Sequence, residues 1–556
     1  MRFRSASRPH NRRSATSRVL AAAYALALTC SLSPSGPAFA DEQSDNDTAA
    51  SAASSASPPK ADAHAALAAS GTGAASRAPS VGQAIPREAS TTSEHVLSLH
   101  GRKFDYRATA GTLLLRDDNG EPEASVFYVA YTHKAEHGAA RPVTFLFNGG
   151  PGAASVFLLM GSVGPKRVRT DSPAATPPAP YLLADNPDTL LDKTDLVFID
   201  AVGTGFSKPV GHGNGKRFWS VDGDLDAFVR FIDRYLSVTD RWNSPKFLIG
   251  ESYGTTRAAM LAYRLGQHNI SLNGVVLLSS VLNSNMRAPG LDLMYVRYLP
   301  SYAATAWYHD KLGPGKRPNL PAFLDEVRQF AAGPYAAALA QGDALPDAQR
   351  DEIAAQVARY TGLDARYVIG AKLRILPSHF RKQLLLAQTR NVGRYDSRFE
   401  GIEYDQTSSS PDYDPSEKYV TSAFDAAFHR HLAQDLHYTN DNTYRVFNDH
   451  VLGAWDWKHH AWWGETLNAP YAAADLAEAM RQNPHLLVLS ANGYFDLATP
   501  FFATEYDLSH MGLEPSLRKN VRITYYATGH MIYLDDAALH ALKGDLSTFY
   551  DDATRR

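Results

Sequence analysis

A serine between two glycines, in Gly250-Glu-Ser-Tyr-Gly254, follows the apolar run 246–249 and precedes a helical pattern over 255–264. This strand–turn–helix setting is typical of a nucleophile elbow, where a sharp turn exposes the serine hydroxyl at the end of a buried strand. Small residues on either side let the strand and the helix pass closely. The setting predicts Ser252 as a nucleophile, although five such residues could also form only a tight turn.

Short apolar runs alternate with helical patterns on both sides of Ser252. Most of these runs end near Gly, Asn or Asp, and they span residues 143–147, 196–200, 247–250, 275–279, 486–490 and 521–526. Their length suits strands buried on both faces of a mostly parallel sheet. Helical patterns such as 222–236 lie between them, so the sequence predicts a doubly wound α/β architecture.

The first forty residues predict an export signal of bacterial type. Six arginines and no acidic residue precede an apolar stretch over 19–28, and Ala38-Phe39-Ala40 fits a cleavage site. The apolar stretch is short for a retained membrane anchor, so we expect cleavage, no stable membrane insertion, and a periplasmic or extracellular product. The only cysteine, Cys30, lies within this segment, which leaves the exported protein without thiol chemistry.

Composition divides the rest of the chain into four parts. Residues 41–93 are rich in Ala, Ser, Pro and Gly and predict a disordered linker. The strand pattern occupies 94–281 and returns over 467–556, which we interpret as two parts of one catalytic domain. Residues 282–466 lack that pattern and carry Ala-rich helical segments. They predict a helical insertion, or cap, over the carboxyl edge of the sheet and the active site.

The charge balance and the histidine pattern exclude two classes of partner. The chain has 55 basic and 58 acidic residues and a formal net charge of −3, which argues against nucleic-acid binding. His459 and His460 invite a metal site, but adjacent side chains point in different directions and no acidic partner is suitably spaced. We therefore expect no metal and no cofactor.

Candidates for an acid and a base follow the last two predicted strands. Asp496 comes after the run 486–490, and His530 comes after the run 521–526. Loops at the carboxyl ends of parallel strands are where open α/β sheets place their sites. The chain order Ser, Asp, His predicts a triad in which His530 takes the proton of Ser252 and Asp496 orients the imidazole. A lone histidine after a strand is more often structural, but three motifs in this order argue against that reading.

The glycine-rich segment Asn148-Gly-Gly-Pro-Gly152 follows an early predicted strand. Glycines there let backbone amides approach a substrate closely, so the segment predicts one half of an oxyanion hole. The amide of Tyr253, at the start of a helix, is the expected other half. The alternative is a sharp loop with no role in chemistry.

Taken together, these motifs resemble the signature blocks of the serine carboxypeptidase family. The blocks are Asn148-Gly-Gly-Pro-Gly152, Gly203-Thr-Gly-Phe-Ser207, Gly250-Glu-Ser-Tyr-Gly254, Gly493-x-x-Asp496 and Gly529-His-Met531, within a similarity that spans about residues 95–550. The resemblance implies an α/β-hydrolase fold and peptide substrates with a free C-terminus. It also implies an acyl-enzyme on Ser252 and release of a C-terminal amino acid.

The resemblance also implies roles for individual residues. The amides of Gly150 and Tyr253 would form the oxyanion hole, whereas Asn148, Gly149 and Glu251 would bind the terminal carboxylate of the substrate. Two carboxylates in contact cannot both stay ionised, so one must carry a proton. We therefore expect the peptidase activity to be strongest at acidic pH. The alternative for Glu251 is an exposed turn residue.

One departure and two other functions stay open. Ser162 stands where the family often has a second glutamate, which weakens the expected acidic preference. An esterase or acyltransferase would use the same acyl-enzyme with another nucleophile. A binding protein that keeps the fold without catalysis is the remaining possibility.

Overall fold

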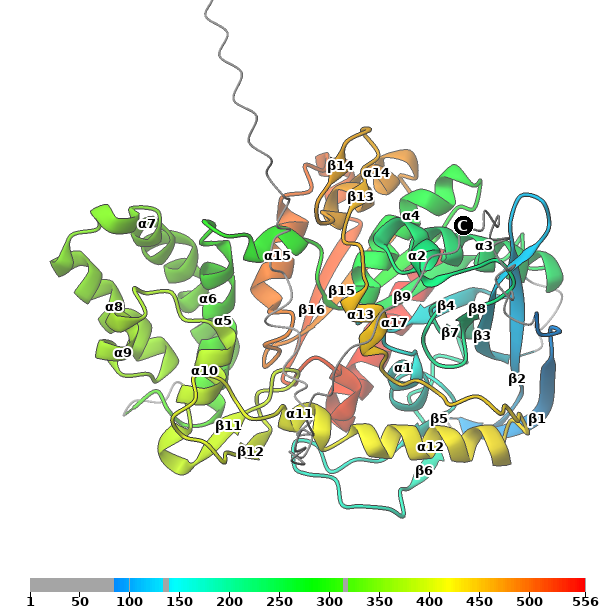
Figure 1. Cartoon of the computed structure of the whole chain (residues 1–556), viewed down its shortest axis with the longest axis horizontal. Coiled ribbons are helices and arrows are strands. Elements are labelled where there is room, and N and C mark those ends of the chain that lie inside the picture. The colour runs from blue at the N-terminus through cyan, green and yellow to red at the C-terminus, as the bar shows by residue number, and fades with distance from the viewer. Residues whose placement is uncertain (1–84, 100, 134–139, 314–318, 556) are drawn as a thin grey trace, which may run out of the picture. The chain divides into compact units, whose positions relative to one another are not determined.

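The computed structural model describes residues 85–99, 101–133, 140–313 and 319–555 (Figure 1). All of them belong to one compact unit, Asp45–Arg556. The predicted export signal and residues 41–84 of the predicted linker lie outside the described residues. Within the described part, no helix is both long enough and apolar enough to span a bilayer.

A ten-stranded mixed sheet forms the centre of the fold (Figure 1). Across the sheet the strands run β1 (Ser90–Leu99), β2 (Arg102–Arg116), β3 (Pro122–Thr132), β7 (Asp195–Ile199), β4 (Val143–Phe147), β9 (Lys246–Ser252), β10 (Gly274–Ser280), β15 (Leu487–Gly493) and β16 (Val521–Tyr526), and β8 (Lys208–Pro209) pairs with β3. The six strands from β7 to β16 are mutually parallel, while β1, β2 and β3 form an antiparallel extension. The predicted mostly parallel α/β sheet is confirmed.

Helices cover both faces of this sheet. One face carries α3 (Val221–Val238), α4 (Tyr253–Gln267) and α14 (Ala472–Gln482), and the other carries α1 (Val156–Gly161), α12 (Thr421–Gln434) and α17 (Asp536–Thr554). Alternate residues of β10 point into the two cores: Val275 and Leu277 into the first, Val276 and Leu278 into the second. This alternation explains why the central strands appear in the sequence as continuous apolar runs.

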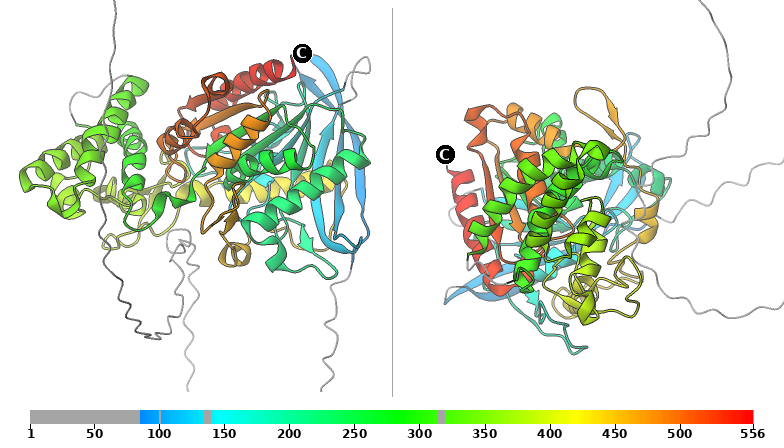
Figure 2. Two further views of the ribbon diagram at one scale, coloured as in Figure 1. Left: turned by 90° about the horizontal axis from the view of Figure 1, so that it is seen from above. Right: turned by 90° about the vertical axis from the view of Figure 1, so that its left-hand side faces the viewer.

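A third core lies among helices of the middle stretch, which gather beside α15 (Phe501–Ser509) in Figures 1 and 2. They are α5 (Leu293–Tyr308), α6 (Leu320–Phe330), η3 (Ala331–Tyr335), α7 (Ala336–Leu339), α8 (Asp347–Thr361), α9 (Ala365–Gly370) and α10 (Pro377–Gln383). This core includes Tyr494, Phe495 and Leu497 from the loop that follows β15. The helices therefore pack against a loop at the carboxyl edge of the sheet.

The stretch 282–466 is not one separate layer, however. Its helix α12 packs on the sheet side through Phe424, Phe428 and Leu432, which belong to the core of α1 and α17. Among the described residues, this stretch contributes no strand to the large sheet. The boundaries of the insertion at 282 and 466 stay a prediction.

Short elements complete the chain between these layers. They are β5 (Lys166–Val168), β6 (Leu183–Asp185), α2 (Gly215–Phe218), η2 (Ser284–Arg287), η4 (Gly342–Ala344), η5 (Leu386–Gln388), β11 (Arg390–Val392), β12 (Glu400–Ile402), α11 (Pro415–Lys418), α13 (Asp449–Gly453), β13 (His459–His460), β14 (Thr466–Leu467), α16 (Pro515–Arg518) and η6 (Ile532–Leu534). The two-stranded ribbons β5–β6, β11–β12 and β13–β14 are antiparallel.

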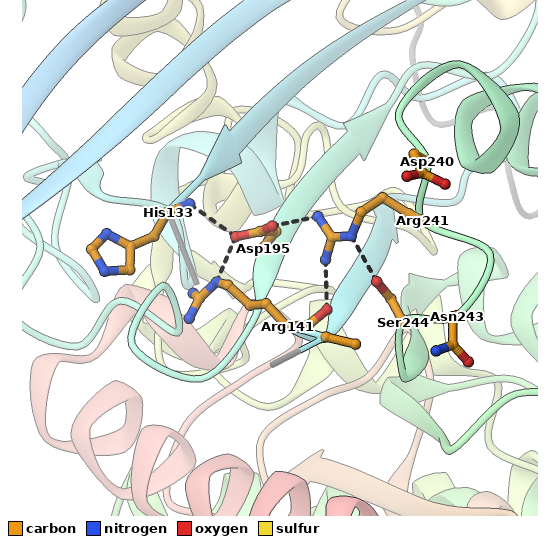
Figure 3. Close-up of a pocket in the computed structure, with 8 residues that line it drawn as sticks. His133, Arg141, Asp195, Asp240, Arg241, Asn243 and Ser244 are labelled. Atoms are coloured by element: carbon orange, nitrogen blue, oxygen red, sulfur yellow. Dashed lines mark hydrogen bonds and ion pairs between the residues drawn. The ribbon is translucent and has the colours of Figure 1, made fainter. Parts of the chain in front are cut away.

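A pocket at the amino ends of β4, β7 and β9 is bridged by ionic contacts (Figure 3). Asp195, the first residue of β7, accepts from Arg141 Nε at 2.6 Å and from Arg241 Nη1 at 2.5 Å. Arg241 Nη2 also donates to the backbone oxygens of Arg141 and Pro142. These contacts fasten the amino edge of the sheet, at the opposite end of the strands from Ser252.

Candidate active site

Ser252 lies at the last position of β9, directly before α4, and is partly exposed. Its backbone has φ +60° and ψ −130°, a combination that costs a non-glycine residue energy and recurs at functional turns. A side chain at Gly250 would place its Cβ 2.0 Å from the backbone oxygen of Gly254. Only glycine fits there, and the local geometry is that of the predicted nucleophile elbow.

The structure brings Asp496 and His530 together at the carboxyl edge of the sheet. Asp496 follows β15, His530 follows β16, and Asp496 Oδ2 lies 2.7 Å from His530 Nδ1. The carboxylate is itself held by its own loop: Oδ1 accepts from the amides of Ala498 and Thr499 at 2.8 and 2.9 Å. Thr499 Oγ1 donates to Oδ2 at 2.6 Å. A fixed carboxylate of this kind sets the orientation and the tautomer of the imidazole.

The other ring nitrogen of His530 is available for the serine. His530 Nε2 is buried and has no hydrogen-bond partner among the described residues, Ser252 included. Burial alone would lower the pKa of His530, but the charge and hydrogen bond of Asp496, together with Glu251, raise it above its ordinary value. Hydrogen bonds to the base are often loose before substrate binds, so this arrangement fits a triad.

The glycine-rich loop after β4 lies against the start of α4. A Cβ at Gly149 would sit 2.4 Å from the amide nitrogen of Tyr253, so the loop backbone closely approaches this amide. Gly150 has φ +98°, which favours glycine. The loop backbone thus lies against the Tyr253 amide beside Ser252, where the oxyanion hole is predicted.

Buried charges that the sequence did not reveal hold this loop in place. Arg257, in α4, donates from Nη1 to the backbone oxygen of Asn148 at 2.7 Å. The same guanidinium is paired with Asp224 of α3, with Nε 2.6 Å from Oδ2. Farther along the loop, the amide of Ser155 donates to Asp200 Oδ1 at 2.8 Å.

Asn148 and Glu251 are hydrogen-bonded to each other next to the nucleophile. Asn148 Nδ2 donates to Glu251 Oε1 at 3.1 Å, and Asn148 Oδ1 accepts from the amide of Leu158 at 3.0 Å. Glu251 is only 3% exposed, so the alternative of an exposed turn residue is wrong. Burial raises the pKa of Glu251 to about 7, although the charge of His530 opposes this shift. The Ser162 hydroxyl turns away and donates to Leu158 O at 2.5 Å.

A segment of the middle stretch, residues 394–398, joins the acid loop to the base loop. The backbone oxygen of Arg394 accepts from Leu497 N at 3.0 Å, and that of Tyr395 accepts from His530 N at 2.6 Å. Arg398 Nη2 donates to Thr528 Oγ1 at 2.8 Å. The sequence did not predict this connection between the two loops. The alternating charges of residues 394–398 are the one sequence feature that could have indicated it.

The tryptophan-rich segment 455–463 contributes to two places: two of its tryptophans pack beside the active site, and its His459 belongs to a separate cluster of buried charges. Trp455 and Trp457 pack edge-on against Tyr253, with ring centroids 5.4 and 5.8 Å apart. His459 is buried, and its Nδ1 lies 2.9 Å from Asp222 Oδ1 while its Nε2 lies 3.3 Å from Asp475 Oδ2. No acidic partner spaced for a metal site was expected, yet two carboxylates meet this ring: Asp222 lies 237 positions before His459 and Asp475 lies 16 positions after it. In the described part of the chain, no group of three His, Cys, Asp or Glu residues could hold a metal ion.

Comparison with known proteins supports a family assignment. Residues 103–309 match the model of the serine carboxypeptidase family. The pheromone-processing carboxypeptidase KEX1 of Saccharomyces cerevisiae is 30% identical over 175 residues, which are 29% of this chain and 22% of the yeast protein. Serine carboxypeptidase-like 36 of Arabidopsis thaliana is 25% identical over 175 residues, or 30% of this chain and 34% of the plant protein.

The crystal structure of KEX1, described as a prohormone-processing carboxypeptidase, extends the similarity to the whole fold. It superposes with a TM-score of 0.51 at 17% identity and covers 81% of this chain and 92% of that chain. The sequence matches span only a minor part of the relatives' own lengths. The family match contains Asn148, Glu251 and Ser252 but ends before Asp496 and His530. Residues 103–309 therefore resemble the serine carboxypeptidase family, and the fold is of the α/β-hydrolase type seen in KEX1.

Proposed function

We propose that the protein is a serine-type carboxypeptidase that releases C-terminal amino acids from peptides through an acyl-enzyme on Ser252. The observation that carries this proposal is the hydrogen-bonded pair of Asn148 and Glu251 beside the nucleophile. A terminal carboxylate would accept from the Asn148 amide and, once Glu251 is protonated, from its carboxyl group. The family match over residues 103–309 supports the same activity.

The first half of the reaction would form the acyl-enzyme. Ser252 Oγ attacks the scissile carbonyl carbon while its proton passes to His530 Nε2. The amides of Gly150 and Tyr253 stabilise the oxyanion of the tetrahedral intermediate. As the C–N bond breaks, His530 returns the proton to the leaving amine, and the C-terminal amino acid departs.

The second half would regenerate the enzyme. A water molecule loses a proton to His530 Nε2 and attacks the acyl carbon, and His530 then protonates Ser252 Oγ as the ester bond breaks. Asp496, held by Thr499, stabilises the imidazolium in both halves. Every step uses side chains and amides of this chain.

The proposal is tested with an N-blocked dipeptide and its C-terminal amide, at pH 5 and pH 7.5. We expect release from the free acid to exceed release from the amide at pH 5, and to vanish in Ser252→Ala. Cleavage of an ester through Ser252 without release from either peptide would instead assign an esterase or acyltransferase. Failure of a fluorophosphonate probe to label Ser252 would favour the non-catalytic binding protein.

We further propose that the protein is exported, with residues 1–40 removed. The support is the basic, apolar and small-residue pattern of this segment. N-terminal sequencing of the protein recovered outside the cytoplasm should begin at Asp41. Recovery only in the cytoplasm with residue 1 intact would contradict export.

A further inference from the structure

Two buried polar atoms lie without a partner beside the nucleophile. Neither Tyr533 OH nor Glu251 Oε2 has a hydrogen-bond partner among the described residues, and both are shielded from solvent. Such atoms are rare in folded proteins and call for a physical explanation. The other carboxylate oxygen of Glu251 accepts from Asn148, so the pair that the proposed function uses is only half satisfied.

Packing fixes the Tyr533 ring. The residue lies in η6, three positions after His530, and is 1% exposed. A Cβ at Gly161 would meet its Cδ2 and Cε2 atoms at 2.7 Å, so the ring packs directly against the end of α1. Ser162 comes next in the chain, and its own hydroxyl is occupied by Leu158 O. The phenol thus fills space beside the position where the family often has a second glutamate.

The phenol stays neutral here and can donate a hydrogen bond. Burial raises the pKa of Tyr533 well above its ordinary value, and the neighbouring carboxyl of Glu251 raises it further. Tyr533 therefore keeps its proton throughout the working pH range. A neutral donor beside a carboxylate oxygen without a partner is complementary to it, whereas a second carboxyl group would compete for one proton.

We propose that Tyr533 is a positioning residue of the carboxylate-binding site, whose hydroxyl donates to Glu251 and holds it, with Asn148, against the substrate's terminal carboxylate. This inference rests on the proposed carboxypeptidase function. In the ionised state the phenol stabilises the Glu251 carboxylate, and in the protonated state it fixes which oxygen carries the proton. One tyrosine thus takes the place of a second acidic side chain.

The pH dependence of the site follows from a small set of groups. The charged and titratable groups that act on Glu251 are His530, Asp496 and Tyr533, and Arg394 acts in turn on His530. The catalytic triad takes part in the cleavage of the free acid and of the amide alike. Among the titratable groups, only Glu251 and Tyr533 distinguish a free acid from an amide, so the pH dependence of the ratio of the two activities isolates their contribution.

The test compares Tyr533→Phe with the wild type on an N-blocked dipeptide, its C-terminal amide and a matched ester, from pH 5 to pH 9. The phenylalanine keeps the ring contact with Gly161 and loses only the hydroxyl. We expect KM for the free acid at pH 5.5 to rise about tenfold, the cost of one hydrogen bond to an ionisable group. KM and kcat for the amide and the ester should stay within about twofold.

A second readout separates positioning from packing. Without the phenol donor the ionised form of Glu251 is less stable, so its pKa rises. The pH at which the free-acid preference is lost should therefore move upward, by about one unit. Tyr550→Phe is the matched control, because Tyr550 is equally buried and its hydroxyl lies 2.6 Å from Thr144 Oγ1, near the amino end of β4. It should change neither quantity.

The outcomes distinguish the inference from the proposed function. If the wild type prefers the free acid and Tyr533→Phe shifts neither its KM nor the pH midpoint, the inference is overturned and the function stands. A uniform loss on all three substrates would make Tyr533 a packing residue and also overturn it. A wild type without any free-acid preference would overturn the carboxylate site and the inference together.

Discussion

Arg257 donates a 2.7 Å hydrogen bond to the backbone oxygen of Asn148 and thereby ties the helix after Ser252 to the loop that carries Asn148. The guanidinium is 1% exposed and packs 4.5 Å from the Phe228 ring centroid. Its ion pair with Asp224 is equally buried. The nucleophile and the predicted oxyanion loop are thus joined by a charged group that takes no part in the chemistry.

Replacing Arg257 by Met should destabilise the protein by about 3–5 kcal/mol, because Asp224 is left as a buried charge without a partner. The double variant Arg257→Met, Asp224→Leu should recover most of this loss in urea denaturation. It should not recover kcat, because the tie to Asn148 O is still absent. Full recovery of both quantities would show that Arg257 contributes only to folding.

Thr499 is a second positioning residue, and its removal should slow the reaction without unfolding the protein. Thr499→Val keeps the shape but loses the hydroxyl that donates to Asp496 Oδ2 at 2.6 Å. Two amides still hold the carboxylate, so we expect kcat to fall about 10- to 100-fold for peptide and ester alike. Thr499→Ser retains the donor and should stay near wild type. Equal activities of the two variants would contradict the role.

The buried ion cluster around His459 predicts a loss of stability at alkaline pH. Burial alone would lower the pKa of His459, but hydrogen bonds and charges from Asp222 and Asp475 raise it to about 9. Since the folded pKa exceeds the unfolded value of about 6.5, the stabilisation is complete below pH 6.5. It is lost as the pH rises toward 9, and it amounts to at most about 3 kcal/mol.

Denaturation of the wild type and His459→Gln between pH 6 and pH 10 tests this prediction. The wild type should lose stability over that range more steeply than the variant, because glutamine has no proton to lose. Parallel curves for the two proteins would show that His459 stays neutral between its two carboxylates.

The strands of the sheet could be predicted because their burial is local information. The expected run 143–147 coincides with β4, which is buried along its whole length, since a strand covered on both faces needs a mainly apolar sequence. The run 521–526 coincides with β16, which lies at the edge of the sheet and is mostly only partly buried. The elbow at Ser252 was predictable in part for a similar reason. Gly254 is required by Phe147 O, which is distant in the sequence, but Gly250 is required by Gly254 O, four positions away. At Gly250, the residue that the turn geometry requires is therefore visible in the local sequence.

Contacts between distant loops could not be predicted in this way. Asp222 and His459 are 237 positions apart, and no periodic pattern relates a helix start to a short ribbon. The same holds for the backbone bond from His530 to Tyr395 and for the ring of Tyr533 on Gly161. These contacts depend on how the loops meet above the sheet, so they cannot be predicted from patterns within one sequence.

The burial of Glu251 corrects the expected pH dependence and gives the sharpest test of the carboxylate site. With a pKa of about 7, Glu251 is protonated at pH 5 and can donate to a substrate carboxylate. It becomes an anion above neutrality and repels that carboxylate. The preference for a free acid over an amide should therefore persist to near pH 7 and fall above it, not only near pH 5. Both substrates use His530, so the ratio cancels the titration of the base.

Glu251→Gln removes the titration and keeps a neutral group that can donate. We expect this variant to prefer the free acid by a similar ratio at pH 5.5 and pH 8.5, whereas the ratio of the wild type should fall about tenfold or more between these values. Glu251→Ala should lose the preference at every pH, because no donor replaces the carboxyl group. If the ratio in Glu251→Gln falls with pH as it does in the wild type, the titrating group is not Glu251, and the terminal carboxylate must be bound elsewhere.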